Sequence, residues 1–236
     1  MPNFTFKGIS SDSMGVVVLD YPPIIKASAR VTLTQIPGRS GTLTLQSPEK
    51  DFEPVEKVCQ CRLLAGASLT AVAAWLDGRG TLIFGNEPVY AYTARVGDEI
   101  SFEKIMPGYE DRIFDATFVC QPWKELVTPG ADIALVTNPQ TIISPGTLDS
   151  LPLITITGVG AVSINIGSYS FTLSGIQSGI PVKVDCDAMT ATNSNQSVSY
   201  LQNMTGQFPR LVPGSNNVIW SGTVTSVVIK PRYRWL

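Results

Sequence analysis

Two residue pairs have types and spacings that could do chemistry. Asp185 and Asp187 alternate along a predicted strand, so both carboxylates would share one face, as the acids of a glycoside hydrolase do around a sugar. Nothing in the sequence marks a deep cleft beside them. Cys59 and Cys61 also share a face, but no second pair and no histidine completes a tetrahedral metal site. We therefore expect buried thiols at Cys59 and Cys61, and no metal site.

Two further patterns resemble ligand sites. Gly158-Val159-Gly160 lacks the third glycine of a nucleotide-binding loop, and its flanks are strand-like, so the pattern predicts a hairpin turn. Trp123, Trp220 and Trp235 could stack on sugars, although aromatic residues of a sandwich lie more often in a core or an interface. These patterns predict no catalytic residue and no cofactor, and they leave glycan binding as an alternative.

The composition excludes several classes of function. The chain has 236 residues and no histidine, which removes histidine-dependent triads and histidine-ligated metals. Its 17 Lys and Arg nearly balance 19 Asp and Glu, whereas nucleic-acid binding needs a clustered basic surface. No stretch resembles a membrane span or a secretory signal. The four cysteines are too scattered for a disulfide scaffold, so we expect free thiols in a protein made in a reducing cytoplasm.

Charge is distributed unevenly and suggests two domains. Residues 1–128 carry 27 charged side chains, whereas residues 129–236 carry only nine. A composition step at a stretch rich in proline and glycine is typical of a domain boundary. We predict a first domain over 1–130, a linker over 131–145 and a second domain over 146–236, whose last strand could pack back on the first.

The first half predicts an α+β arrangement, an antiparallel sandwich with one helix. Ala29–Ile36 alternates, turns at Ile36–Gly41 and returns over Thr42–Gln46, which indicates a hairpin. The helix is expected over 68–77, with Ser68 as its N-cap. The spacing of its apolar residues predicts that Leu69, Val72 and Leu76 pack on the sheet. Trp75 is expected at the margin of this contact.

The second half predicts an all-β sandwich. Short alternating runs recur every ~8–12 residues between glycine-rich turns, so the fold class is mainly β. Its last run alternates Lys230, Arg232 and Arg234. We expect these cations to face the acids of a neighbouring subunit.

Several motifs, in this order and spacing, resemble the distal tail protein (Dit) family of long, non-contractile-tailed bacteriophages. The most specific is Ile36-Pro37-Gly38-Arg39-Ser40-Gly41, in which Ser40 replaces the usual acid or amide. The others are Phe4–Ser11 followed by Gly15, Trp75–Gly78 with Leu82–Phe84, Phe114–Pro122, Asn138-Pro139, Pro145–Thr147, Pro152–Ile154 and Phe208–Asn216. The resemblance covers essentially the whole chain.

The resemblance implies a structural protein of the virion without catalysis. Its N-terminal belt domain would form a homo-hexameric ring, and its C-terminal domain would be a galectin-like sandwich. The ring would connect the tail tube to the hub protein of the tail tip or baseplate, and so to host adsorption and receptor-binding proteins. The protein would be assembled in the host cytoplasm and lie at the phage tail tip. The chain has no room for an inserted carbohydrate-binding module.

A ring needs a heterologous interface, formed by two different patches of one subunit. We expect Arg39 to fork onto a neighbour's carboxylate, a geometry that lysine cannot reproduce. The predicted interface residues are Ile36, Pro37, Gly38, Arg39, Gly41, Arg232 and Arg234. Two other functions stay open, a lectin-like glycan-binding module for host attachment and a hydrolase of cell-wall polymer.

Overall fold

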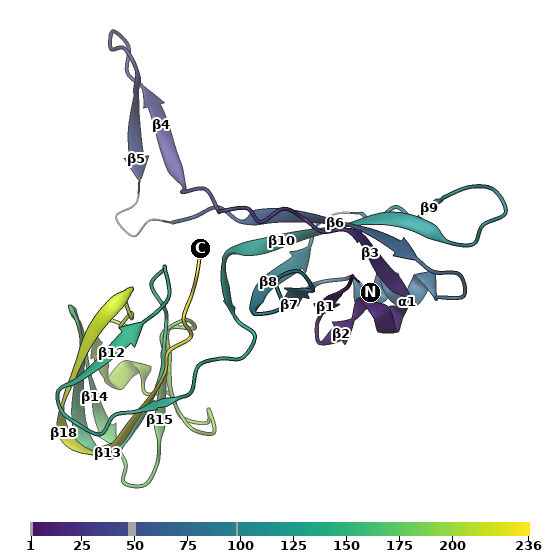
Figure 1. Ribbon diagram of the computed structural model, residues 1–236. Helices are drawn as coiled ribbons and strands as arrows, with labels where there is room; N and C mark the ends of the chain where they lie inside the picture. The colour runs from purple at the N-terminus through teal and green to yellow at the C-terminus, as the bar shows by residue number, and fades with distance from the viewer. Residues whose placement is uncertain (1, 47–50, 98) are drawn as a thin grey trace. The chain divides into compact units, whose positions relative to one another are not determined.

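The computed structural model describes residues 2–46, 51–97 and 99–236 (Figure 1). The chain divides into two compact units: unit 1 is Met1–Val127 with Leu236, and unit 2 is Thr128–Trp235. The described residues are mostly in strands and include one α-helix, which lies in unit 1. The predicted class, mainly β with one helix in the first half, is confirmed.

Unit 1 is built on an eight-stranded antiparallel sheet. The strand order is β2-β1-β7-β8-β10-β6-β3, and β9 pairs with β10. The strands are β1 (Phe4–Phe6), β2 (Ile9–Ser10), β3 (Val16–Asp20), β6 (Val55–Leu63), β7 (Arg79–Phe84), β8 (Tyr90–Val96), β9 (Glu103–Lys104) and β10 (Arg112–Leu126). A short 3-10 helix, η1 (Ser11–Met14), precedes β3. Strict alternation in β6 turns Cys59 and Cys61 inward, as the sequence predicts.

Aromatic rings form the centre of this core. Phe4, Phe6 and Phe118 are fully buried, and their rings pack at centroid distances of 5.4 Å (Phe4 to Phe118) and 5.6 Å (Phe6 to Phe118). Such tilted and edge-to-face pairs stabilise a core beyond the area that they bury.

Helix α1 (Leu69–Trp75) covers this core, and its predicted start is confirmed because the Ser68 hydroxyl accepts a hydrogen bond from the Ala71 N–H at 3.3 Å. Val72 and Leu76 are buried, whereas Leu69 is half-buried. The spacing of the helix predicts Trp75 at the margin of the sheet, and this prediction is wrong. Trp75 is buried and stacked on Phe4, because its indole N–H finds an acceptor inside the core, the Phe6 carbonyl at 3.0 Å.

The predicted hairpin is confirmed as β4 (Val31–Gln35) and β5 (Thr42–Gln46). These strands form a separate two-stranded sheet (Figure 1). In the turn, the Arg39 N–H donates to the Ile36 carbonyl at 3.1 Å, and Gly38 and Gly41 adopt positive φ angles that suit glycine. At the base, Arg30 forms an ion pair with Glu53.

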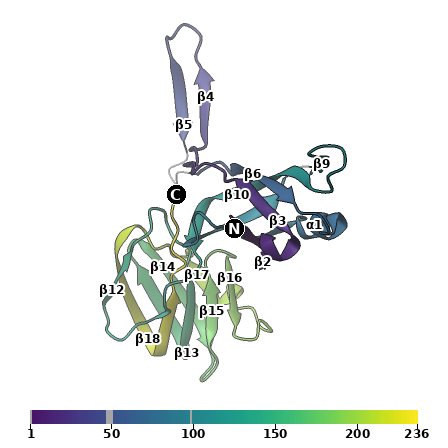
Figure 2. The same ribbon diagram turned by 45° about the vertical axis from the view of Figure 1, so that its right-hand side comes forward.

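Unit 2 is a second antiparallel β structure (Figure 2). Its main path is β11-β18-β13-β14-β17, with β12 on β18, and β15 joining β13 to β16. The strands are β11 (Ile133–Ala134), β12 (Gln140–Ser144), β13 (Leu153–Ile166), β14 (Tyr169–Ile176), β15 (Val182–Asp185), β16 (Thr190–Asn193), β17 (Met204–Gly206) and β18 (Gly214–Lys230); a 3-10 helix, η2 (Leu201–Asn203), precedes β17.

Two sequence expectations for this half are corrected. Gly158-Val159-Gly160 is not a hairpin turn, because it lies inside β13, where the pairing with β18 shifts register around Val159 and Val162. A bulge places extra residues in one strand without ending the ladder. Residues 131–145 are not a plain linker, since they contain β11 and β12. Ile142 of β12 is buried in the core, which fixes that strand to β18.

Candidate functional site

The hairpin surface, defined here as Val31–Gln46, exposes aliphatic side chains on both faces. Directly paired residues share a face, so Val31 and Leu33 lie on one side and Leu43 and Leu45 on the other. All four are exposed, Leu33 to 61%. The remaining strand residues are threonine and glutamine. A ribbon of this kind has no core of its own, so both faces are suited to contact with other chains.

Arg39 is the one charged residue of the hairpin surface. It lies in the turn with the other predicted contact residues, all exposed, namely Ile36, Pro37, Gly38 and Gly41. The structure therefore brings these five residues together at one tip. Their contact with another subunit stays a prediction.

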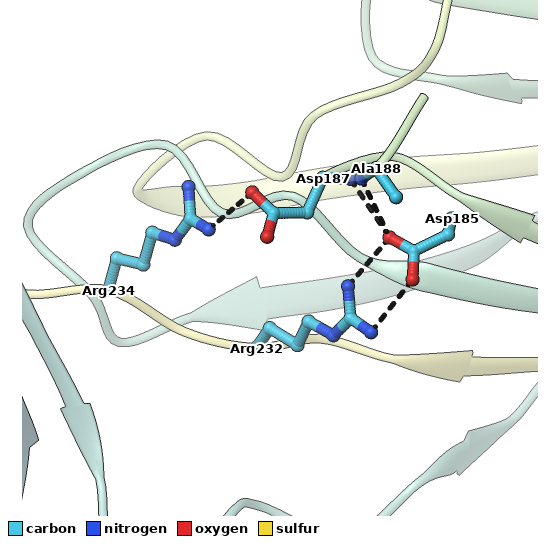
Figure 3. Close-up of polar contacts among 5 residues, drawn as sticks. All are labelled: Asp185, Asp187, Ala188, Arg232 and Arg234. Atoms are coloured by element: carbon cyan, nitrogen blue, oxygen red, sulfur yellow. Dashed lines mark hydrogen bonds and ion pairs between the residues drawn. The ribbon is translucent and has the colours of Figure 1, made fainter. Parts of the chain in front are cut away.

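Arg232 and Arg234 each have a carboxylate partner within unit 2 (Figure 3). Arg232 donates through both terminal nitrogens to Asp185, at 2.7 and 3.0 Å. Arg234 donates to Asp187 at 2.8 Å, and its own side chain is only 7% exposed. Asp185 is the last residue of β15, whereas Asp187 lies in the turn that follows, so the prediction that the two acids share one strand face is wrong. Arg232 has a positive φ of 49°. Contact of Arg232 and Arg234 with another subunit stays a prediction.

The same ion pairs explain the presence of Asp185 and Asp187 in unit 2 without a catalytic role for them. Burial disfavours the charged form of Asp185, but the Arg232 guanidinium and the Ala188 and Asp187 N–H groups outweigh it, so the pKa of this carboxyl lies below its ordinary value. A carboxyl held in its charged form is a poor proton donor at neutral pH. This arrangement favours a structural role for both acids.

Replacing Asp185 with asparagine is expected to destabilise unit 2 by about 1–3 kcal/mol at pH 7, because Arg232 loses its charged partner. Since the pKa of Asp185 is lowered by folding, its contribution is present above the unfolded value, about 3.9, and is lost as the pH falls through the folded value. The difference between the two proteins should therefore shrink below about pH 4. Urea unfolding at a series of pH values measures this difference in the free energy of unfolding.

The exposed Asp132, replaced by asparagine, is the control and should shift stability by less than about 0.5 kcal/mol. An equal gap at pH 7 and pH 3 would contradict the assignment.

The three tryptophans occupy different settings. Trp123 lies in β10 of unit 1, whereas Trp220 and Trp235 belong to unit 2. Trp220 is half-buried, and its backbone N–H and carbonyl pair with the amide of Asn138, at 3.3 and 2.6 Å. Trp235 packs edge-on against Tyr233. Glycan binding by these side chains stays a prediction.

The cysteines are buried free thiols, as the sequence predicts. The Sγ atoms of Cys59 and Cys61 lie 3.9 Å apart, and their mutual hydrogen bond together with burial raises the pKa of Cys61. Burial raises the pKa of Cys120 to about 12. Among residues 2–46, 51–97 and 99–236, no three potential ligand side chains gather into a metal site. No helix in these ranges has the length and apolarity to span a bilayer.

Sequence reasoning missed a cationic cavity in unit 1. We call it the basic pocket and define it by Ile24, Ile25, Lys26, Lys57, Tyr92 and Lys124. Lys57 is only 2% exposed, and its ammonium lies 4.8 Å from the Tyr92 ring centroid. Its inward position in β6, in phase with Cys59, is the signal that could have revealed it.

Glu87 balances part of this charge. It accepts hydrogen bonds from the Tyr92 hydroxyl at 2.7 Å and from the Lys124 ammonium at 3.1 Å. Burial lowers the pKa of Lys57, and the charge of Glu87 opposes that change. Burial and the hydrogen bond to Glu87 raise the pKa of Tyr92, so this phenol stays neutral.

The sequence matches no protein-family model and no curated protein. The structure is similar to the crystal structure of the SPP1 Dit (gp 19.1) protein, which is described as a paradigm of the hub adsorption apparatus in phages that infect Gram-positive bacteria. The likeness covers 100% of both chains with a TM-score of 0.78, at 13% sequence identity. The chain therefore has a Dit-like fold.

Proposed function

We propose that this protein is a structural subunit of a phage tail, a distal tail protein that works by contact between chains. Its copies form a ring, with six members as the family resemblance implies. The ring joins the tail tube to the hub and tip proteins that carry host adsorption and receptor binding. The protein is then a virion component of the tail tip, assembled in the host cytoplasm, and its role needs no catalysis or cofactor.

The observation that carries this proposal is the hairpin surface. Two short strands that expose Val31, Leu33, Leu43 and Leu45 gain little from folding alone, since an isolated two-stranded sheet is marginal in water. Contact with neighbouring subunits on both faces would bury these side chains. The Dit-like fold of the whole chain supports the same role.

Replacing Arg39 with glutamate is expected to give a folded subunit that no longer forms rings. The change reverses the one charge of the hairpin surface and removes a guanidinium that can fork onto a carboxylate. Light scattering after size-exclusion chromatography measures the assembly, and negative-stain microscopy shows whether it is a ring.

Two companion variants separate geometry from charge. Arg39→Lys keeps the charge without the fork and should weaken assembly less than glutamate does. Arg95→Glu reverses another exposed arginine of unit 1, in β8, and should leave the rings intact. Rings that persist unchanged in Arg39→Glu would rule out this role for Arg39, and a wild-type protein that stays monomeric with tube and tip proteins present would rule out the proposed function.

A further inference from the structure

The basic pocket has the composition of a docking site for an acidic and apolar group. It is an open cavity of about 190 Å³, larger than the cavities of about 150 Å³ that admit a benzene ring. Three lysines and no Asp or Glu are found among the described residues that line it, and Leu236 lines it as well. Exposed Ile24 and Ile25 add an apolar flank. A buried ammonium such as that of Lys57 is costly to hold, so a further negative charge at the pocket would be favourable.

Unit 1 also carries an exposed segment with one more acid than base. We call Glu103–Glu110 the acidic tip; it consists of β9 and the turn that leads toward β10. Its turn is closed by a hydrogen bond from the Tyr109 N–H to the Met106 carbonyl at 3.2 Å, with Gly108 at positive φ. Met106 and Tyr109 are exposed to 51% and 57%. Glu103 and Lys104 precede these two apolar side chains and Glu110 follows them; all three are exposed, so the segment has two acids and one lysine.

The base of the acidic tip is held firmly. Asp111 follows the tip directly and accepts hydrogen bonds from the Arg62 Nε at 2.8 Å and from the Ala65 N–H at 2.6 Å. The Phe102 ring packs on Phe114 at a centroid distance of 4.7 Å. A knob fixed at its base loses less conformational freedom when it enters a pocket than a free loop would.

The acidic tip and the basic pocket lie at opposite ends of the longest ladder of unit 1. Strands β6 and β10 pair from Leu63 with Arg112, beside the tip, to Val55 with Cys120, beside the pocket (Figure 1). Eight steps at about 3.3 Å each separate these ends by about 26 Å. One copy cannot bring its tip into its own pocket, whereas a second copy can.

We propose that the acidic tip of one subunit docks in the basic pocket of the next. Met106 and Tyr109 would cover Ile24 and Ile25, and the acids of the tip would face the lysines of the pocket. Such a head-to-tail contact joins two different patches and generates a ring when its rotation closes. This inference rests on the proposed function and names one of its intersubunit contacts, distinct from the hairpin surface.

Site-directed crosslinking tests the contact directly. The four natural cysteines are buried, so an exposed cysteine introduced by mutation is the reactive thiol. Ile24→Cys and Tyr109→Cys proteins are mixed and treated with diamide, which oxidises two thiols to one disulfide and is itself reduced. A crosslinked dimer is expected in this mixture. Ile24→Cys mixed with Ile143→Cys, which alters an exposed residue of unit 2, is the control and should give at least about tenfold less. Equal yields in both mixtures would overturn the proposal.

Assembly supplies the second measurement. The pair Met106→Asp with Tyr109→Asp disables the tip, and the pair Ile24→Asp with Lys26→Glu disables the pocket; all four positions are exposed, so circular dichroism should report native folding. Each variant should need at least about tenfold more protein to form rings, as loss of a central apolar contact implies. If the wild type forms rings and the variants form them at the same protein concentration, the docking alone is overturned. If the wild type never assembles, the proposed function is overturned and the docking with it.

Discussion

Replacing Phe118 with alanine is expected to destabilise unit 1 by about 3–5 kcal/mol. The side chain is fully buried, and its ring contacts those of Phe4, Phe6 and Phe84. Alanine would leave a cavity between rings that belong to different strands, and these rings cannot all move inward to fill it. A domain is stable by only about 5–15 kcal/mol, so one substitution removes a large share.

Urea unfolding followed by near-ultraviolet circular dichroism measures this loss. Each unit has its own core, so the part of the transition that reports unit 1 should shift while the part that reports unit 2 does not. Ile143→Ala, a change of an exposed side chain in unit 2, is the control and should stay within about 0.5 kcal/mol of wild type. A loss below about 1 kcal/mol for Phe118→Ala would show that the aromatic centre is not close-packed.

Replacing Gly222 with alanine is expected to destabilise unit 2 by more than about 4 kcal/mol. Gly222 has a φ of +103° in β18, and an added Cβ would lie 2.3 Å from the Ala161 carbonyl oxygen of β13. That oxygen belongs to backbone, so relieving the clash requires the two longest strands of unit 2 to separate. Left-handed strain alone accounts for about 1–3 kcal/mol.

Gly160 provides a matched comparison for this prediction. It also has a positive φ, of +78°, but no atom lies within 4 Å of an added Cβ. Gly160→Ala should therefore show the strain without the clash, about 1–3 kcal/mol. The difference between the two variants in thermal or urea unfolding isolates the close approach of β13 and β18. Equal losses would mean that the strands adjust freely at this point.

Local patterns in the sequence predicted the elements that local physics determines. The hairpin follows from alternation around a proline- and glycine-containing turn, and α1 follows from its spacing and from the Ser68 cap. The inward face of β6 follows from strict alternation of its residues. The sequence also predicted the hairpin turn at Ile36–Gly41, since turn chemistry fixes its position.

Other features depend on contacts between distant residues. Asp185 and Arg232 are 47 positions apart, so nothing local reveals that they pair. The glycines of β13 resemble a turn because only the partner strand β18 shows that the ladder continues past them. The residues that line the basic pocket come from five separate segments, and the buried state of Lys57 depends on the rings of Phe84 and Tyr92.

The exposed aliphatic ribbon of β4 and β5 has a cost for the subunit before it assembles. Strands with little charge and bare backbone edges are prone to unwanted aggregation. A single arginine within Val31–Gln46 is a weak electrostatic safeguard against such pairing. Free subunits should therefore be hard to keep in solution at high concentration, and timely incorporation into a larger particle would remove the hazard.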